Sequence, residues 1–261
     1  MTPPASASTL EATFDPRWII ETTDELLVLN KPAGLSLLRD RSGAADLWTL
    51  LKDRYGKLHL VHRLDKDTSG VLLVARSAAL QRRLTRAFAG RSVRKLYQAR
   101  VVGSLPLRGS GRIDLPLRKG RKSRYRVAGE RAQITRSGNH WQLSEARVPP
   151  ANAATGVSAR THLRVGATGP GWSDLVLRPV TGRTHQLRVH LAWIGHPIRG
   201  DRLYGKPDDP AQRAPRMALH ATRLQIPGIG RWTIPAPGFS PARPDSAASE
   251  LPHTDRPHTG S

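Results

Sequence analysis

One acidic side chain, Asp65, stands out in a strongly basic chain because of the residues on either side of it. It lies in the stretch LVHRLDKDTSGVLLVARS (residues 60–77), between two apolar runs. Arg63 precedes it by two positions, so in an extended segment both side chains point the same way, and the guanidinium would keep the carboxylate ionised. Such a carboxylate can act as a nucleophile or a general base. Asp, Thr, Ser and Gly are equally the residues of an ordinary turn.

Two further residues have types that suit an anionic or aromatic substrate. Arg183 is predicted at the start of a helix, where the macrodipole disfavours a cation. That position becomes favourable if an anion sits there, either the carboxylate of Asp65 or a substrate phosphate. A surface arginine on a turn explains the residue as well. Tyr97 lies in a predicted strand, where an aromatic side chain is commonly a half-buried packing residue. None of the three is decisive alone.

Other kinds of site are not indicated. The sequence lacks the G-x-S-x-G elbow of a serine hydrolase, and it lacks both the G-x-G-x-x-G and the Walker-type loops that bind nucleotides. His185, His190 and His196 are spaced by five and six residues, so they do not share one face of a helix as zinc ligands do. We therefore expect neither a metal nor an organic cofactor.

The elements that must position these residues are mostly strands. Apolar or alternating runs bounded by turn residues predict strands within the segments 18–34, 71–77, 94–103, 158–165 and 173–180. The densest basic run, RKGRKSRYR (118–126), is predicted to be a hairpin or loop, although a charge run alone is more often a solvated face. Strands mixed with a few helices, without regular alternation, predict an α+β fold with a mixed, mainly antiparallel central sheet and flanking helices and loops.

Two helices are predicted from their periodicity and their ends. The first runs from an N-cap at Ser77 to Gly90, with Leu80, Leu84 and Phe88 on one face. The second runs from about Thr184 to Ile194 and ends before Gly195 and Pro197. Its inward residues are Leu187, Leu191 and Ile194.

The composition of the chain bears on its cellular location and its domain organisation. The chain has 261 residues, 38% of them hydrophobic, and no cysteine. No apolar run approaches the roughly 18–20 residues that span a membrane, and the N-terminus does not resemble a signal peptide. We expect a cytoplasmic protein with one domain over residues 16–236, between disordered tails at 1–15 and 237–261.

The charge of the chain indicates its partner. The formal net charge is +22, and because residues 1–17 and 237–261 each carry −1, the middle of the chain carries +24. Excess charge of this size within the folded part is typical of a protein that binds a polyanion. We therefore expect nucleic acid as the partner, over the alternative of a basic surface that only aids solubility.

Taken together, several segments resemble motifs of the RluA-type RNA pseudouridine synthases. HRLDKDTSG resembles the central active-site motif of that family, and KLYQA its tyrosine-bearing motif. RPVTGRTHQLRVHLAWIGHPIRGDRLYG, RMALHATRL and NKPAG resemble three more, and the segments occur in the family's order over about residues 18–236.

The resemblance implies the pseudouridine synthase fold and an isomerase that converts specific uridines of structured RNA to pseudouridine. It implies that Asp65 is the catalytic aspartate, Arg183 its ion-pair partner and Tyr97 the residue that packs on the flipped uracil. Because one carboxylate suffices, as nucleophile or as base in glycal formation, no cofactor is needed. Substrate-binding roles are expected, from the motifs and the basic run, for a further set of residues: His62, Arg63, Leu64, Lys95, Arg121, Lys122, His185 and Gln186.

Two features depart from the family pattern. After NKPAG the chain continues as LSLLRDRSGAADLW, where many relatives have a short Val-His-Pro-like stretch. Many relatives also carry an N-terminal S4 RNA-binding domain, for which the first 17 residues are too few, so we expect the catalytic domain itself to select the RNA. We expect a monomer that acts on ribosomal or transfer RNA. The alternatives are an RNA-binding protein without activity and an N-glycosylase that releases free uracil.

Overall fold

A computed structural model describes residues 13–40, 43–107, 109–122, 124–144, 156–206 and 208–239. The described residues group into two compact units, divided between Arg86 and Ala87. The single domain over residues 16–236 stays a prediction. Most of the two predicted tails, residues 1–12 and 240–261, lies outside the described residues. Phe14, inside the predicted first tail, makes edge-to-face contacts with Trp18 and Tyr55.

The first unit is built on short antiparallel strands. β2 (Leu26–Lys31) pairs on one side with β1 (Ile19–Thr22) and on the other with β4 (Ser69–Ala75), and β3 (His59–Leu60) also pairs with β4. A one-turn 3-10 helix, η1 (Pro16–Trp18), precedes β1. All seven residues of β4 are buried, which confirms the predicted buried strand in this region.

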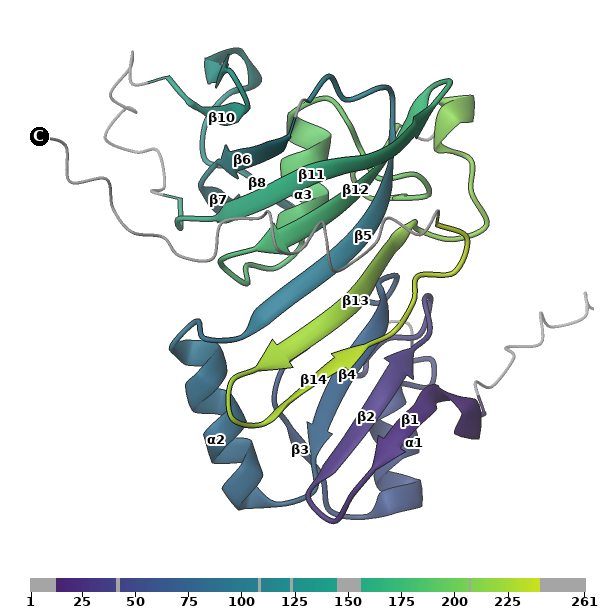
Figure 1. Ribbon diagram of the computed structural model, residues 1–261. Helices are drawn as coiled ribbons and strands as arrows, with labels where there is room; N and C mark the ends of the chain where they lie inside the picture. The colour runs from purple at the N-terminus through teal and green to yellow at the C-terminus, as the bar shows by residue number, and fades with distance from the viewer. Residues whose placement is uncertain are drawn as a thin grey trace, which may run out of the picture. The chain divides into compact units, whose positions relative to one another are not determined.

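Two helices belong to this part of the chain (Figure 1). α2 (Ala78–Ala89) confirms the predicted helix, and the amide of Leu80 donates to the hydroxyl of its predicted cap, Ser77, over 3.1 Å. α1 (Leu47–Tyr55) was not predicted. Its cap is Asp46, whose carboxylate accepts hydrogen bonds from the Thr49 amide and hydroxyl, both at 3.0 Å.

The second unit contains a sheet in the order β13-β5-β12-β11-β6-β10-β9, with β14 paired to β13. All its neighbours are antiparallel except β10 and β6, which are parallel, so the predicted mixed, mainly antiparallel sheet is confirmed. A separate hairpin pairs β7 with β8, where the basic hairpin was predicted. The bounds are β5 (Arg94–Val102), β6 (Ser110–Asp114), β7 (Leu117–Lys119), β8 (Tyr125–Val127), η2 (Arg131–Gln133), β9 (Ile134–Ser137), β10 (His140–Leu143), β11 (Arg160–Gly169), β12 (Trp172–Pro179), α3 (Gln186–Trp193), η3 (Pro210–Gln212), β13 (Leu219–Ile226) and β14 (Gly230–Thr233).

One helix, α3, packs against this sheet and closes the core of the second unit (Figure 1). The predicted inward residues Leu187 and Leu191 are buried there with Leu163, Leu175 and Leu177 of β11 and β12. Burying a leucine side chain stabilises a fold by about 1.5–3 kcal/mol, so this cluster holds α3 against the sheet. Across the described residues, no helix is long and apolar enough to span a membrane.

Candidate active site

Asp65 lies in a tight turn that leads into β4. The amide of Thr68 donates to the carbonyl of Asp65 over 3.1 Å, which closes the turn. Leu64 is 5% exposed and anchors the segment in the core, whereas the neighbouring Arg63 is exposed. The backbone therefore holds position 65 firmly while the flanking arginine remains accessible.

A buried lysine supports this turn from β2. Lys31 is fully buried, and its Nζ donates to the carbonyls of Pro32, Lys66 and Thr68 over 2.7, 2.9 and 3.1 Å. Burial lowers the pKa of Lys31 to about 7, while the nearby charges of Asp67 and Asp65 act to raise it. The sequence analysis did not assign Lys31 to the site, although its place in NKPAG, where an apolar strand ends, was a signal for a buried cation.

His62 attaches the same segment to β4. The amide of Leu73 donates to Nε2 of His62 over 2.9 Å, just after β3 ends at Leu60. The side chain thus supplies an acceptor where the strand pairing stops. Because Nε2 accepts this bond, a proton on the neutral ring must sit on Nδ1.

Tyr97 and Lys95 are two residues apart on β5, so their side chains project from the same face of the strand. Tyr97 lies opposite Leu177 of β12, is partly buried and packs against the core. Burial lowers the pKa of Lys95. Its Nζ lies so close to Gly182 that a β-carbon at that position would be 3.3 Å away. The ammonium of Lys95 therefore lies beside the loop that carries Arg183.

Gln186 fixes that loop. Its Oε1 accepts from the Thr181 hydroxyl over 2.6 Å and from the Arg183 amide over 3.1 Å. Its Nε2 donates to the Arg160 carbonyl over 2.9 Å and to the Thr161 hydroxyl over 3.0 Å. At 4% exposure the amide is enclosed by the protein, so Gln186 ties the loop to β11.

Arg183 and His185 lie in the last residues before α3. Arg183 is exposed, and its Nε donates to the Ser158 carbonyl over 3.1 Å. His185 has a left-handed backbone conformation, with φ of 55°, and it is the last residue before the helix. α3 starts at Gln186, two residues after the predicted start at Thr184. Left-handed conformations at residues other than glycine gather at functional sites.

Tyr204 joins the start of α3 to the β7–β8 hairpin. Its hydroxyl lies 2.8 Å from Nδ1 of His185 and accepts the amide hydrogen of Tyr125 over 2.8 Å. Arg188 and Asp201 stabilise the same region through a buried bidentate ion pair, with both contacts at 2.8 Å. Arg121 and Lys122 are exposed in the loop between β7 and β8.

The predicted site residues fall into the two units. Asp65 lies in the first unit with three predicted substrate-binding residues, His62, Arg63 and Leu64. Arg183 and Tyr97 lie in the second unit with Lys95, Arg121, Lys122, His185 and Gln186. The pairing of Asp65 with Arg183 stays a prediction.

The histidines considered as metal ligands have other roles. His190 is fully buried; its Nε2 donates to the Leu115 carbonyl over 2.9 Å, and its Nδ1 lies 3.0 Å from the Thr161 hydroxyl. Nδ1 of His196 lies 3.0 Å from the Val102 carbonyl. In the described part of the chain, no three His, Asp or Glu side chains gather as a metal site would require.

Comparisons with known proteins agree on one family. The model of the family described as RNA pseudouridylate synthase matches residues 25–193, a range that contains Asp65, Tyr97 and Arg183. The chain is 36% identical to the dual-specificity RNA pseudouridine synthase RluA of Escherichia coli over 227 residues, which cover 84% of this chain and 92% of that protein. It is 37% identical to an uncharacterized RNA pseudouridine synthase of Zymomonas mobilis over 219 residues, 81% of this chain and 88% of the relative. Among solved structures, human RNA pseudouridylate synthase domain containing 1 has a TM-score of 0.65 and 28% identity, covering 97% of this chain and 92% of the human one.

Proposed function

Because this chain belongs to the RNA pseudouridylate synthase family, it is an isomerase that acts on RNA, and we propose that Asp65 is the carboxylate that catalyses the reaction. Uridine becomes pseudouridine when the C1′–N1 bond breaks, the uracil turns and C5 joins C1′, so no atom is gained or lost. One ionised carboxylate can serve this reaction, either as the nucleophile at C1′ or as the base in glycal formation.

The observation that carries this assignment is the construction of the turn at position 65. The buried amino group of Lys31 donates hydrogen bonds to three backbone carbonyls of the adjoining segments, two of them those of residues 66 and 68. Holding a reacting group within a fraction of an ångström is what an active site requires of its scaffold. The position of Asp65 in the HRLDKDTSG motif supports the same role.

Tyr97 and Arg183 complete the proposal. Tyr97 would stack on the uracil once the nucleotide has left its base stack, since a stacked uridine is out of reach. Arg183 would keep the catalytic carboxylate ionised or hold a substrate phosphate. Because the amide of Gln186 is enclosed by the loop, we assign this residue to positioning Arg183, in place of the direct RNA contact expected from the sequence.

We propose structured RNA, ribosomal or transfer, as the substrate, and the name of the Escherichia coli relative describes an RNA pseudouridine synthase with dual specificity. We further propose that the protein acts as a monomer in the cytoplasm, which its lack of cysteine fits. Light scattering of the purified protein tests the monomer, and a dimer at working concentration would contradict it.

The experiment is pseudouridine mapping of total RNA incubated with the wild type, Asp65→Asn, Asp65→Ala and the control Asp53→Asn. Asp53 is exposed on α1, so its substitution removes a carboxylate without touching the turn. We expect a discrete modified uridine with the wild type and the control and none with either Asp65 variant, while RNA binding persists. Turnover by Asp65→Asn above a few per cent of the wild type would refute the role of Asp65. Free uracil as the product would indicate a glycosylase.

A further inference from the structure

Strand register places a row of basic side chains on one face of the sheet in the second unit. Arg178 of β12 lies opposite His162 of β11, His162 lies opposite Arg112 of β6, and Arg112 is paired with His140 of β10. Residues paired across neighbouring strands project from the same side of a sheet. The row therefore crosses four strands on a single face.

This face is the one opposite Tyr97. Tyr97 is paired with Leu177, the residue before Arg178, so the two rows project from opposite sides of β12. The row of Tyr97 and Leu177 packs with α3 in the hydrophobic core. The basic row therefore projects from the opposite side of the sheet to Tyr97, the residue of this unit that is proposed to stack on the uracil.

One carboxylate, that of Asp114, organises the basic residues at the β6 and β10 end of the row. Its Oδ2 lies 2.8 Å from Nε of Arg112 and 3.0 Å from Nε2 of His140, and its Oδ1 lies 2.5 Å from Nε of Arg160. Nη2 of Arg112 also lies 3.3 Å from the His140 ring. One negative charge therefore faces two guanidinium groups, which leaves the cluster positive.

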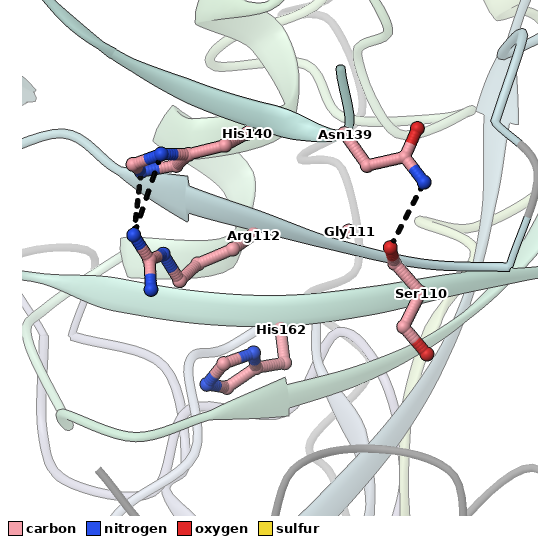
Figure 2. Close-up of a pocket in the computed structure, with 6 residues that line it drawn as sticks. All are labelled: Ser110, Gly111, Arg112, Asn139, His140 and His162. Carbon is pink, nitrogen blue, oxygen red and sulfur yellow. Dashed lines mark hydrogen bonds between the residues drawn. The ribbon is translucent and has the colours of Figure 1, made fainter. Parts of the chain in front are cut away.

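A pocket of about 280 Å³ opens at this cluster. Figure 2 shows Arg112 between the rings of His140 and His162, with the amide of Asn139 and the hydroxyl of Ser110 at the other end. The side chain of Arg112 is 41% exposed and that of Arg160 is 34% exposed, so an anion from solution can reach both. Guanidinium, imidazole, amide and hydroxyl groups around one hollow are a set that binds phosphate oxygens.

The positive charge continues along the same face. Arg164 follows His162 by two residues on β11, so it projects from the same side. Asp174 of β12 projects from this face too, and its carboxylate is already held by Arg100 through bonds of 2.7 and 2.8 Å. Over the described residues of β6, β10, β11 and β12, this face therefore carries four arginines and two histidines against two carboxylates, those of Asp114 and Asp174.

We propose that this face binds the phosphodiester backbone of the RNA substrate at a point away from the target uridine, with the Arg112–His140 pocket holding one phosphate. The inference rests on the proposed function and extends it by a second binding surface. Cationic side chains that contact phosphates give affinity for RNA without reading its sequence. The surface would therefore favour long, folded RNA over a short stem–loop.

The test compares two double variants that remove the same charge. Arg112→Gln with Arg164→Gln removes two cations from the face, and Arg82→Gln with Arg231→Gln removes two exposed cations elsewhere. The probes are a full-length RNA in which the wild type forms pseudouridine and a minimal stem–loop cut from it around the target. We expect the first variant to lower the ratio of kcat/KM on full-length RNA to that on the stem–loop by about three- to tenfold. We also expect it to reduce the salt slope of binding by about 1 for each phosphate that the protein no longer neutralises. The control should keep the wild-type ratio and slope.

The outcomes separate this inference from the proposed function. If the wild type forms no pseudouridine in any RNA, the proposed function fails. If the wild type is active but the two double variants give equal ratios and salt slopes, the face does not bind RNA and the inference is overturned. Arg164→Gln alone leaves the Asp114 cluster intact, so it repeats the test should the double variant not fold, with a smaller reduction expected in the same direction.

Discussion

Gln186 offers the sharpest test of how the structure builds its active site. Gln186→Leu keeps a side chain of similar volume but removes all four hydrogen bonds of the Gln186 side chain, two of them within the loop and two to β11. The groups left behind are the Thr181 hydroxyl, the Arg183 amide, the Arg160 carbonyl and the Thr161 hydroxyl. Leucine offers none of them a partner.

The magnitude follows from these four groups. A buried polar group that loses its partner costs about 1–3 kcal/mol, and the two hydroxyls can turn toward other partners. The backbone amide of Arg183 cannot turn, whereas the carbonyl of Arg160 keeps the hydrogen bond that it accepts from the Val180 amide over 3.0 Å. We therefore expect the free energy of unfolding to fall by about 1–3 kcal/mol, with the change arising mainly from the Arg183 amide. Because Arg183 is one of the affected residues, we also expect kcat to fall by more than tenfold, corresponding to about 1.4 kcal/mol or more in the barrier.

Urea denaturation and single-turnover kinetics measure the two effects. The matched control is Gln142→Leu on β10, where the side chain is exposed and the change in stability should stay within about 0.5 kcal/mol. Gln186→Glu keeps an oxygen at Oε1 and should recover part of kcat if the bond to the Arg183 amide is what matters. A Gln186→Leu enzyme with wild-type stability and kcat would refute the assignment of Gln186 to positioning.

Three further predictions follow from other parts of the structure. Neutralising the basic residues at 118, 119, 121 and 122 in the hairpin should weaken RNA binding and reduce its salt dependence, and an unchanged slope in binding titrations would place the RNA elsewhere. Lys31→Met should lower the free energy of unfolding by about 2–4 kcal/mol, because the three carbonyls that Lys31 binds lose a buried donor. Urea denaturation measures this change, and a decrease below about 0.5 kcal/mol would contradict the prediction. Burial lowers the pKa of His190 to about 4 from 6.5, so the unfolded chain takes up the proton first as the pH falls. The free energy of unfolding should therefore fall by about 3 kcal/mol as the pH drops from about 6.5 to 4. Denaturation at several pH values measures this, and the free energy of unfolding of His190→Gln should depend less steeply on pH.

The sequence predicted those elements whose signals are local. α2 was recognised because its cap Ser77 and its buried residues Leu80 and Leu84 lie within one short segment. The β7–β8 hairpin was recognised from a charge run between turn residues. α1 was missed because its segment was considered only as a departure from the family pattern, although Asp46 before an apolar pair is a start signal.

The parts that escaped prediction depend on contacts between distant residues. The parallel pairing of β10 with β6 joins segments about 28 residues apart, and no local pattern specifies which strand will be the neighbour. Gln186 was assigned to the substrate from its motif because its bonds to Arg160 and Thr161 reach 26 and 25 residues back along the chain. Lys31 is similar, since two of its three acceptors lie 35 and 37 residues away.

The amino group of Lys31 binds three carbonyl oxygens around one nitrogen and so stabilises the turn, as a structural metal ion does in other proteins. An ion of that kind must be taken from solution, and its occupancy changes with concentration. Here the amino group is attached to β2 by a covalent stem, so every folded molecule carries it. The shape of the turn is therefore independent of divalent ion levels, even where the folding of an RNA substrate is governed by them.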